Sequence, residues 1–346
     1  MSILACPIPF AADEFILLGH GSGGRLTAKL MEDVFLPAFR NAALERMDDQ
    51  AVFDVPAGRV AMSTDTYVVK PMFFPGGNLG ELAVYGTVND LAVGGAKPKY
   101  LSAAFVLEEG LPLETLRRLV NCMAVAARRC GVEIVTGDTK VVEKGSGDGV
   151  FVNTAGIGFV PEGVSYSAAN VRPGDRIVLN GSLGEHGITI LAQREGLELG
   201  GDLRSDAAPL HELCAAVMKA APGLHAMRDL TRGGLSSALN EIARSAQVGV
   251  EIEERAIPVC DEVRGACELF GLDPLYVANE GKMIAFVPED EAETAVAGMR
   301  ANELGRQARI IGVVTERHAR MVTLRTTLGT ERIVDMLAHD QLPRIC

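Results

Sequence analysis

The sequence predicts an α/β protein of two domains, each with its own layer of strands and helices. The chain has 346 residues, of which 48% are hydrophobic and 23% charged, which is enough to bury two separate cores. Segments with the periodicity of strands alternate with segments that have the periodicity of helices in both halves of the chain. Turn residues cluster between positions 161 and 175, so we place the domain boundary there.

The first series of elements follows an N-terminal segment, residues 1–50. Alternating apolar residues predict strands at residues 59–64, 99–108, 132–142 and 150–160. Helical periodicity predicts helices at residues 78–93 and 113–130. We therefore predict a first domain over residues 51–162, built on a mixed α/β layer.

The second series predicts another α/β domain, over residues 172–328. Its helices are expected at residues 185–195, 210–221, 235–246 and 290–304. Its strands are expected at residues 176–180, 248–252, 283–287 and 309–315. The remaining residues, 329–346, are expected to form a flexible C-terminal tail.

Composition and charge exclude several classes of protein. The net charge of −12 and the pI near 5.1 argue against a nucleic-acid partner, because such proteins present basic surfaces to phosphates. Apolar runs stop well short of the roughly 18 residues that a membrane-spanning helix needs. Residues 1–10 contain two prolines and no basic region, unlike a secretory signal. We expect a cytoplasmic enzyme that acts on small molecules, with no membrane contact.

The seven cysteines form neither a disulfide framework nor a zinc motif, because their number is odd and no CxxC pair occurs. Cys122, Cys130, Cys214 and Cys267 lie in predicted amphipathic helices, where small buried side chains are expected. Cys346 differs because it is the last residue of the chain. A tail of about 16 residues could carry its thiol roughly 50 Å as a movable nucleophile. The alternative is a chance buried or frayed cysteine.

Two acidic motifs recur along the chain. Asp65-Thr66 is echoed by Asp138-Thr139, and Asp90-Leu91 with two glycines is echoed by Asp229-Leu230 with two glycines. Each aspartate alone could be a cap or turn residue. Together they favour a site for Mg²⁺ and a nucleotide, because Mg²⁺ takes one or two carboxylates plus phosphate oxygens. The second copies also bring Lys140 and Arg232, cations suited to phosphate.

The glycine loop at residues 19–24 matches the pattern GxGxxG. A dinucleotide-binding fold would also need an acidic residue about 20 positions later, at the end of an apolar strand. Glu45 has that spacing but lies in a polar stretch, and the chain has no GxxxxGK[ST] loop. We therefore expect neither a dinucleotide fold nor a Walker loop, while the loop amides remain able to close over phosphates.

Taken together, these motifs resemble the HypE family of hydrogenase maturation factors, carbamoyl dehydratases related to aminoimidazole ribonucleotide synthetase and selenophosphate synthetase. The resemblance covers nearly the whole chain except the first dozen residues. It rests on the glycine loop, Ser63-Thr64-Asp65, Phe73-Phe74-Pro75-Gly76-Gly77, residues 86–92, Gly137-Asp138-Thr139-Lys140, residues 227–234, Asn279-Glu280-Gly281-Lys282 and the terminal Pro343-Arg344-Ile345-Cys346. The terminal motif is the most specific of these.

The resemblance implies a two-domain PurM-like fold in which the mixed sheet of the first domain dimerises and ATP binds between subunits. It implies that the carbamoyltransferase HypF places a carbamoyl group on Cys346. ATP then phosphorylates the amide oxygen, and loss of both nitrogen protons gives a thiocyanate. The cyanide would pass to the HypC-HypD scaffold for the iron of a [NiFe] hydrogenase.

The resemblance also assigns the site residues. It implies that Cys346 carries the substrate while Lys140 and Glu280 remove the nitrogen protons. Mg²⁺ would be held by Asp65, Asp90 and Asp138. ATP would be bound by Gly21, Gly23, Gly24, Thr64, Asp65, Asn89, Asp90, Gly137, Asp138, Thr139 and Arg232. The plainer alternatives are a phosphate or carboxylate contact for Lys140 and a surface ion pair or cap for Glu280.

Two other functions remain open at this point. A related synthetase could phosphorylate a small molecule such as selenide, but its reactive Cys or Sec would be expected near the glycine loop, which contains only His20 and Ser22 besides glycine. A non-catalytic carbamoyl carrier would need the tail but not the nucleotide aspartates.

Overall fold

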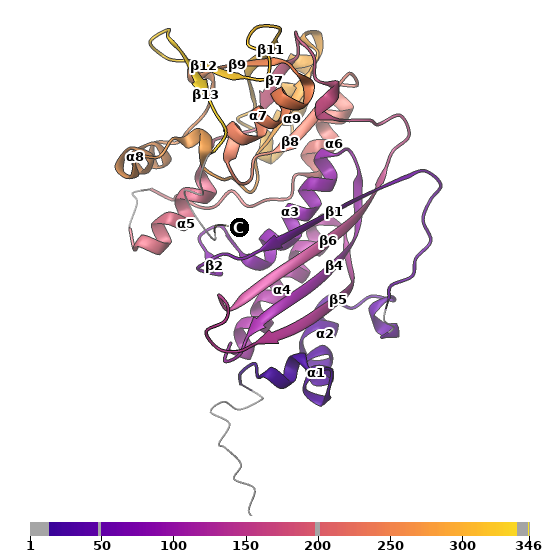
Figure 1. Ribbon diagram of the computed structural model, residues 1–346. Coiled ribbons are helices and arrows are strands. Elements are labelled where there is room, and N and C mark those ends of the chain that lie inside the picture. The colour runs from indigo at the N-terminus through magenta and orange to yellow at the C-terminus, as the bar shows by residue number, and fades with distance from the viewer. Residues whose placement is uncertain (1–13, 48–49, 198–200, 338–344, 346) are drawn as a thin grey trace, which may run out of the picture.

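The computed structural model describes residues 14–47, 50–197, 201–337 and 345 (Figure 1). The described chain builds a four-stranded sheet, a seven-stranded sheet and a separate two-stranded ribbon of β2 (Phe73–Phe74) and β3 (Gly77–Asn78). Both large sheets carry helices, so the predicted α/β class is confirmed.

The first sheet has the strand order β1-β6-β4-β5. Its strands are β1 (Arg59–Tyr67), β4 (Lys97–Glu108), β5 (Glu133–Val142) and β6 (Val150–Val160). β4 and β5 run parallel and the other neighbours antiparallel, so the sheet is mixed. Alternate residues such as Leu101, Phe105 and Leu107 are buried beneath helices α3 (Leu79–Val93) and α4 (Leu113–Cys130), which lie on one face.

The opposite face, which we call the open face, presents its side chains to solvent. Met62 on β1 is 72% exposed and Val106 on β4 is 37% exposed, although both are apolar. Asp138 and Lys140 point to the same face, because Asp138 pairs with Ala104 and Lys140 with Val106. A large apolar side chain on an exposed sheet face is typical of a surface that receives a partner.

Helix α3 is buried on nearly all sides because it lies between the two sheets. One side contacts β1 and β6, and the other contacts α6 (His211–Ala220) and β8 (Ala226–Asp229) of the second half. A helix that is apolar all round is expected only in such a position. This arrangement brings the C-terminal turns of α3, with Asn89 and Asp90, against the second half of the chain.

The described N-terminal residues pack on the first sheet and do not form a separate unit. The segments η1 (Leu18–Gly21), α1 (Arg25–Leu30), η2 (Met31–Phe35), α2 (Leu36–Phe39) and η3 (Leu44–Arg46) follow one another. Ile16 and Phe35 join the first core. The glycine loop begins within the 3₁₀ turn η1, and of the described residues that precede η1, only Phe15 pairs as in a sheet, in an isolated bridge to Pro112. A dinucleotide-binding loop instead follows a strand of a parallel sheet.

The second sheet has the order β13-β12-β9-β11-β7-β10-β8. Besides β8, its strands are β7 (Arg176–Leu179), β9 (Gly249–Glu253), β10 (Met283–Val287), β11 (Arg309–Thr315), β12 (Val322–Arg325) and β13 (Glu331–Val334). Every residue of β10 is buried, because helices cover both faces of the sheet at this point.

The helices of the second half form two cores on the two faces. α6 packs with α9 (Ala292–Arg300), while α7 (Gly234–Ala246) packs in the other core with Ile177 and Leu179 of β7. α5 (Glu185–Glu195) packs with α8 (Asp261–Phe270) beside them. Short 3₁₀ turns occur at η4 (Ala168–Asn170), η5 (Glu254–Ala256), η6 (Pro274–Tyr276), η7 (Glu289–Glu291) and η8 (Glu303–Gly305).

Two details differ from the sequence-based expectations. β13 lies within residues 329–346, the range predicted as tail, because its residues pair with β12 and extend the second sheet. Cys130, Cys214 and Cys267 are buried on helices as predicted, whereas Cys122 is only half-buried. Of the described helices, none combines the length and the apolar character that crossing a membrane requires.

Candidate active site

Three aspartates from distant parts of the chain meet where α3 contacts β8, and we call Asp65, Asp90 and Asp229 the acidic cluster. Asp65 lies on the helix-facing side of β1, and Asp90 lies in the last turns of α3. Ser63 donates a hydrogen bond to Asp90 at 2.6 Å, and Tyr67 donates one to Asp65 at 3.1 Å. Asp229 ends β8 and is almost completely buried.

The electrostatics of the acidic cluster show that its charges are close together. Burial, with a contribution from Asp65, raises the pKa of Asp90. Burial and the charge of Asp90 raise the pKa of Asp229 to about 7, against an opposing effect of Arg228. A cation placed among these carboxylates would therefore relieve an unfavourable interaction.

The acidic cluster fits a magnesium site that is completed by phosphate. No group of three or more Asp, Glu, His or Cys side chains among the described residues is arranged to hold a metal by itself. Mg²⁺ commonly takes only one or two carboxylates and fills its remaining positions with phosphate oxygens and water. Asp65 and Asp90 match that requirement, because both carboxylates face the same junction.

The glycine loop lies along the far edge of the sheet, and we call residues 19–24 with 137–140 the glycine edge. A Cβ atom on Gly21 would come within 2.5 Å of the backbone nitrogen of Val141, so only glycine allows this approach. Gly23 has a φ of +79°, and Gly24 precedes the first turn of α1. The loop therefore lies beside Asp138 and Thr139, where the Thr139 amide donates to Asp138 at 2.8 Å.

The sheet separates the acidic cluster from the glycine edge within one chain. The strand register runs from Asp65 through Thr154 and Ala103 to Gly137, across the full width of the sheet. Three strand spacings correspond to about 14 Å. Asp65 faces the helices, whereas Asp138 is exposed on the open face. One chain thus presents two half-sites, and Asp138 does not join Asp65 and Asp90.

The remaining predicted nucleotide contacts lie in different surroundings. The Asn89 side chain donates to the carbonyl oxygen of Ala208 at 3.1 Å and accepts from the amide of Leu210 at 2.7 Å. Its amide group thus joins the two halves of the chain. Thr64 lies on the open face and donates to Thr154.

The cations and glycines near the two half-sites also differ in their contacts. Arg232 is exposed in the turn before α7. The cation whose charge lowers the pKa of Asp90 and of Asp229 is Arg228, not Arg232. Gly137 packs so tightly that a Cβ atom would lie 2.1 Å from the Ala103 oxygen, which explains the glycine by strand packing alone.

Glu280 and Lys140 lie in opposite environments. Glu280 is only 3% exposed, and its charge contributes to raising the pKa of Tyr67, after burial and Asp65. Its burial rules out the surface ion pair considered above. Glu280 lies near the acidic cluster, because the neighbouring Asn279 donates two hydrogen bonds to the carbonyl oxygen of Leu230, which follows Asp229. Lys140 is exposed on the open face at the glycine edge. The structure therefore does not bring the two predicted bases together within one chain.

Ile345, the residue before the terminal cysteine, lies beside α5. Cys346, like residues 338–344, lies outside the described residues. Ile345 is described: its side chain is 6% exposed and belongs to the first core with Ile190 and Ala278. The carbonyl oxygen of Ile345 lies 2.7 Å from Nε2 of His186. The residue that precedes the terminal cysteine is thus held in a buried position.

Known proteins share this arrangement along most of the chain. Residues 47–160 match the N-terminal domain of AIR synthase related proteins, and residues 172–324 match the C-terminal domain. Carbamoyl dehydratase HypE of Azotobacter vinelandii is 55% identical over 327 residues, which cover 94% of this chain and 96% of that protein. The chain belongs to the HypE family of carbamoyl dehydratases. Its fold is accordingly the PurM-like fold of AIR synthase related proteins.

Solved HypE structures agree with the computed one. A crystal structure of the hydrogenase maturation protein HypE in complex with ATP has a TM-score of 0.92 and 48% identity, and the match covers 95% of this chain and 99% of that one. HypE in a crystal structure of a HypE-HypF complex has a TM-score of 0.78 and 45% identity, over 89% of this chain and 99% of that one. Both proteins therefore support the same architecture for this HypE-family chain.

Several residues around the site of this HypE-family chain were not predicted from sequence. Ser63 and Tyr67 contact the acidic cluster, and their spacing of two from Asp65 on a strand could have shown that they share its face. His186 and Asp206 had no such signal. They contact Ile345 and Glu280, which lie far away along the chain.

Proposed function

We propose that the chain dehydrates its own carbamoylated C-terminal cysteine in a reaction driven by ATP, and thereby supplies cyanide for the iron of a [NiFe] hydrogenase. One observation carries this proposal beyond family membership: the residue before Cys346 is docked beside residues 278–280, next to the acidic cluster. Gly187 connects the two, because its amide donates to Ala278 at 3.1 Å and its Cα faces the Ile345 side chain.

The chemistry balances without an oxidant or reductant. The γ-phosphoryl group of ATP moves to the carbonyl oxygen of the S-carbamoyl group, and ADP leaves. The two nitrogen protons are then lost while the carbon–oxygen bond breaks, so that a carbon–nitrogen triple bond forms and the oxygen departs as phosphate. Glu280 is suited to take one proton, because a carboxylate is a base at neutral pH. We assign the second proton to Lys140.

ATP and Mg²⁺ are the proposed cofactors. Mg²⁺ would neutralise charge on the phosphates during phosphoryl transfer. Asp65 and Asp90 would hold it, and the repulsion that raises the pKa of Asp90 and Asp229 supports a cation at this place. Gly21, Gly23, Gly24, Thr139 and Asp138 would contact the nucleotide from the glycine edge.

We propose that two copies of the chain dimerise through their open faces. The exposed Met62 and Val106 support this, as does the separation of the two half-sites across the sheet. In such a dimer each site would be composite. One chain would contribute Lys140 and Asp138, and the other would contribute the acidic cluster and Glu280. A second chain would also bury Lys140. Burial would lower the pKa of Lys140, which the side chain needs in order to act as a base.

The carbamoyltransferase HypF and the HypC-HypD scaffold are the proposed protein partners. The known HypE-HypF complex of a relative supports the first of these. The acidic charge of the chain and its lack of a membrane-spanning helix among the described residues fit a cytoplasmic site of action without nucleic acid.

Mass measurement of the C-terminal peptide tests the proposal. The protein is incubated with the carbamoyltransferase and its substrates, with and without ATP for the dehydratase step. We expect the carbamoylated peptide to lose one water only when ATP is present. A carbamoylated peptide that persists while ATP is available would indicate a passive carrier. ATP turnover that depends on added selenide would indicate a small-molecule synthetase.

A further inference from the structure

His186 is a buried polar residue that the proposed chemistry does not use. It lies in the first turn of α5, has no exposed surface and packs edge-on against the ring of Phe74. Both of its ring nitrogens have partners, Ser205 on one side and Ile345 on the other. A fully buried histidine with two specific contacts has a fixed ring orientation.

The directions of these hydrogen bonds follow from the chemistry of the partners. The Ile345 carbonyl can only accept, so Nε2 of His186 carries the proton and donates at 2.7 Å. The hydroxyl of Ser205 lies 2.8 Å from Nδ1 and accepts from the Ala207 amide at 3.2 Å, so it donates its own proton to Nδ1. Burial lowers the pKa of His186, which agrees with the neutral ring that this chain of hydrogen bonds requires.

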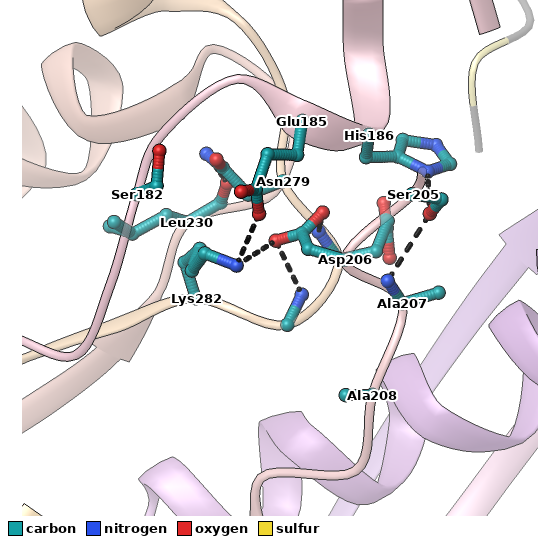
Figure 2. A network of polar contacts seen from close by, with 12 residues as sticks. Ser182, Glu185, His186, Ser205, Asp206, Ala207, Ala208, Leu230, Asn279 and Lys282 are labelled. Carbon is teal, nitrogen blue, oxygen red and sulfur yellow. Dashed lines mark hydrogen bonds and ion pairs between the residues drawn. The ribbon is translucent and has the colours of Figure 1, made fainter. Parts of the chain in front are cut away.

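The same short segment that orients His186 also orients Glu280. Asp206 follows Ser205 and accepts hydrogen bonds from the backbone amides of Glu280 at 3.1 Å and Gly281 at 3.2 Å. Lys282 lies 3.1 Å from Asp206 and 2.9 Å from Glu185, and all three side chains converge in Figure 2. We call residues 205–210 the strap.

The strap is also fixed to the first half of the chain. The Ser205 amide donates to the Pro75 carbonyl at 2.9 Å. Ala208 and Leu210 are held by Asn89, which is the neighbour of Asp90 in the acidic cluster. The six residues of the strap therefore contact His186, the backbone of Glu280 and helix α3, which carries Asp90.

We propose that His186 is a positioning residue that holds the C-terminal tail by the Ile345 carbonyl, and that the strap sets this anchor in register with Glu280. The inference deepens the proposed function and rests on it. Ile345 is bonded directly to Cys346, so the hydrogen bond restrains the backbone next to the reacting sulfur. Holding the reactants in one geometry matters because a misplacement of about 1 Å can cost about 10²-fold in rate.

Replacement of His186 by two amides of different length tests the inference. In H186Q the side-chain nitrogen reaches the place of Nε2 and can still donate to Ile345. In H186N the amide reaches only the place of Nδ1, toward Ser205. We expect dehydration of the carbamoylated peptide to slow by about 10²-fold in H186N and to stay within about threefold of wild type in H186Q. The exposed His318, replaced by Asn, provides the control.

A second measurement reports the anchor without the chemistry. Carboxypeptidase removes Cys346 and then Ile345, and intact mass follows the loss of each residue. We expect Ile345 to be removed faster from H186N than from H186Q or wild type. S205A, which removes the donor to Nδ1, should resemble H186N in both measurements and replaces it if H186N does not fold.

The outcomes separate the inference from the proposed function. If wild type forms no cyano product, the proposed function is wrong, while the carboxypeptidase result still tests the anchor. If wild type forms the product and H186N matches it in rate and in resistance to carboxypeptidase, His186 does not position the tail. If H186Q and H186N lose activity equally while both fold, the reach of the donor is irrelevant and the inference is overturned.

Discussion

At the scale of single residues, Asp229 is a carboxyl group whose pKa lies far above its ordinary value. Its pKa is raised to about 7 by burial first and by Asp90 second. An ionised carboxylate in such surroundings costs free energy that only a cation or a proton can recover. The sequence marked Asp229 as an echo of Asp90, but its burial beside Asp90 depends on the packing of α3 against β8.

This shift predicts how the stability of the metal-free protein depends on pH. The folded pKa of Asp229 lies above its ordinary value of 3.8, so the group favours folding below about pH 4, and this contribution is lost as the pH rises to about 7. We expect D229N to remove that dependence. With a chelator present, D229N should raise the melting temperature by about 2–4 °C or more at pH 8 relative to wild type, and by less at pH 5. Parallel curves for the two proteins would show that Asp229 ionises freely.

Asp90 carries the prediction on the metal. D90N keeps the shape of the side chain and leaves Ser63 its hydrogen-bond acceptor, but it removes a charge from the proposed Mg²⁺ site. We expect the fold to remain and ATP turnover to fall by at least about 10²-fold. Mg²⁺ with ATP should raise the melting temperature of wild type and raise that of D90N less. Unchanged turnover in well-folded D90N would remove Asp90 from the site.

At the scale of elements, the strap joins parts of the protein that no single helix or strand connects. Burial by itself would raise the pKa of Asp206, but the charge of Lys282 and the hydrogen bonds from Lys282 and the Glu280 amide outweigh that effect, so the pKa of Asp206 lies below its ordinary value. The carboxylate thus stays ionised and continues to hold the backbone of Glu280 and Gly281.

We expect D206N to cost more stability than E185Q, although both substitutions remove a carboxylate from Lys282. The Asp206 side chain is 2% exposed, whereas that of Glu185 is 25% exposed and its carboxylate has no comparable backbone contacts among the hydrogen bonds of the described residues. Breaking a buried ion pair costs about 3–5 kcal/mol, and a more exposed one costs less. Urea unfolding of the two variants gives the comparison, and equal losses would contradict the assigned role of Asp206.

Long, strongly periodic elements could be predicted from the sequence, and short or irregular ones could not. The predicted helix at residues 113–130 coincides with α4, and the predicted strand at residues 99–108 lies within β4. β8 and β13 have four residues each, which is too few for an alternating pattern to stand out. The domain limits 51–162 and 172–328 stay predictions.

The site residues show the same division. Motifs located Asp65, Asp90 and Glu280, because local sequence carries their chemistry. The face that each side chain takes is set by register across the sheet, so the separation of Asp138 from Asp65 was not predictable. His186 and Asp206 required knowledge of the packing between α5, the strap and the end of the chain.

At the scale of the whole molecule, the proposed mechanism leaves each chain incomplete as a catalyst, because its two half-sites lie on opposite edges of one sheet. The glycine edge carries Lys140, and the acidic cluster lies beside Glu280. A dimer through the open faces would contain two composite sites, each with Lys140 from one chain and Glu280 from the other.

Mixed dimers test this arrangement. K140A and E280Q are each expected to accept the carbamoyl group and to accumulate the thiocarboxamide, because the dehydration rate falls by about 10²–10⁴-fold. Random mixing of differently tagged K140A and E280Q chains gives heterodimers in half of the population, each with one doubly altered site and one intact site. We expect about a quarter of wild-type activity to return.

The mixture has its own controls. Each variant alone must stay inactive under the same conditions, and exchange of subunits is checked by recovery of both tags in one dimer. If the sites were complete within single chains, every site of the heterodimer would remain defective and no activity would return. M62K, which places a charge on the open face, should prevent dimers in light scattering and abolish the recovery.

The dock at Ile345 has a consequence for the end of the reaction. Its contacts are made to a main-chain carbonyl and an aliphatic side chain, neither of which changes when the neighbouring sulfur passes from thiol to thiocarboxamide to thiocyanate. The contacts to Ile345 alone therefore cannot shift the balance among the three states. These contacts therefore hold the tail as tightly after the reaction as before it. An acceptor with a higher affinity for the cyanated tail than these contacts provide would favour its departure.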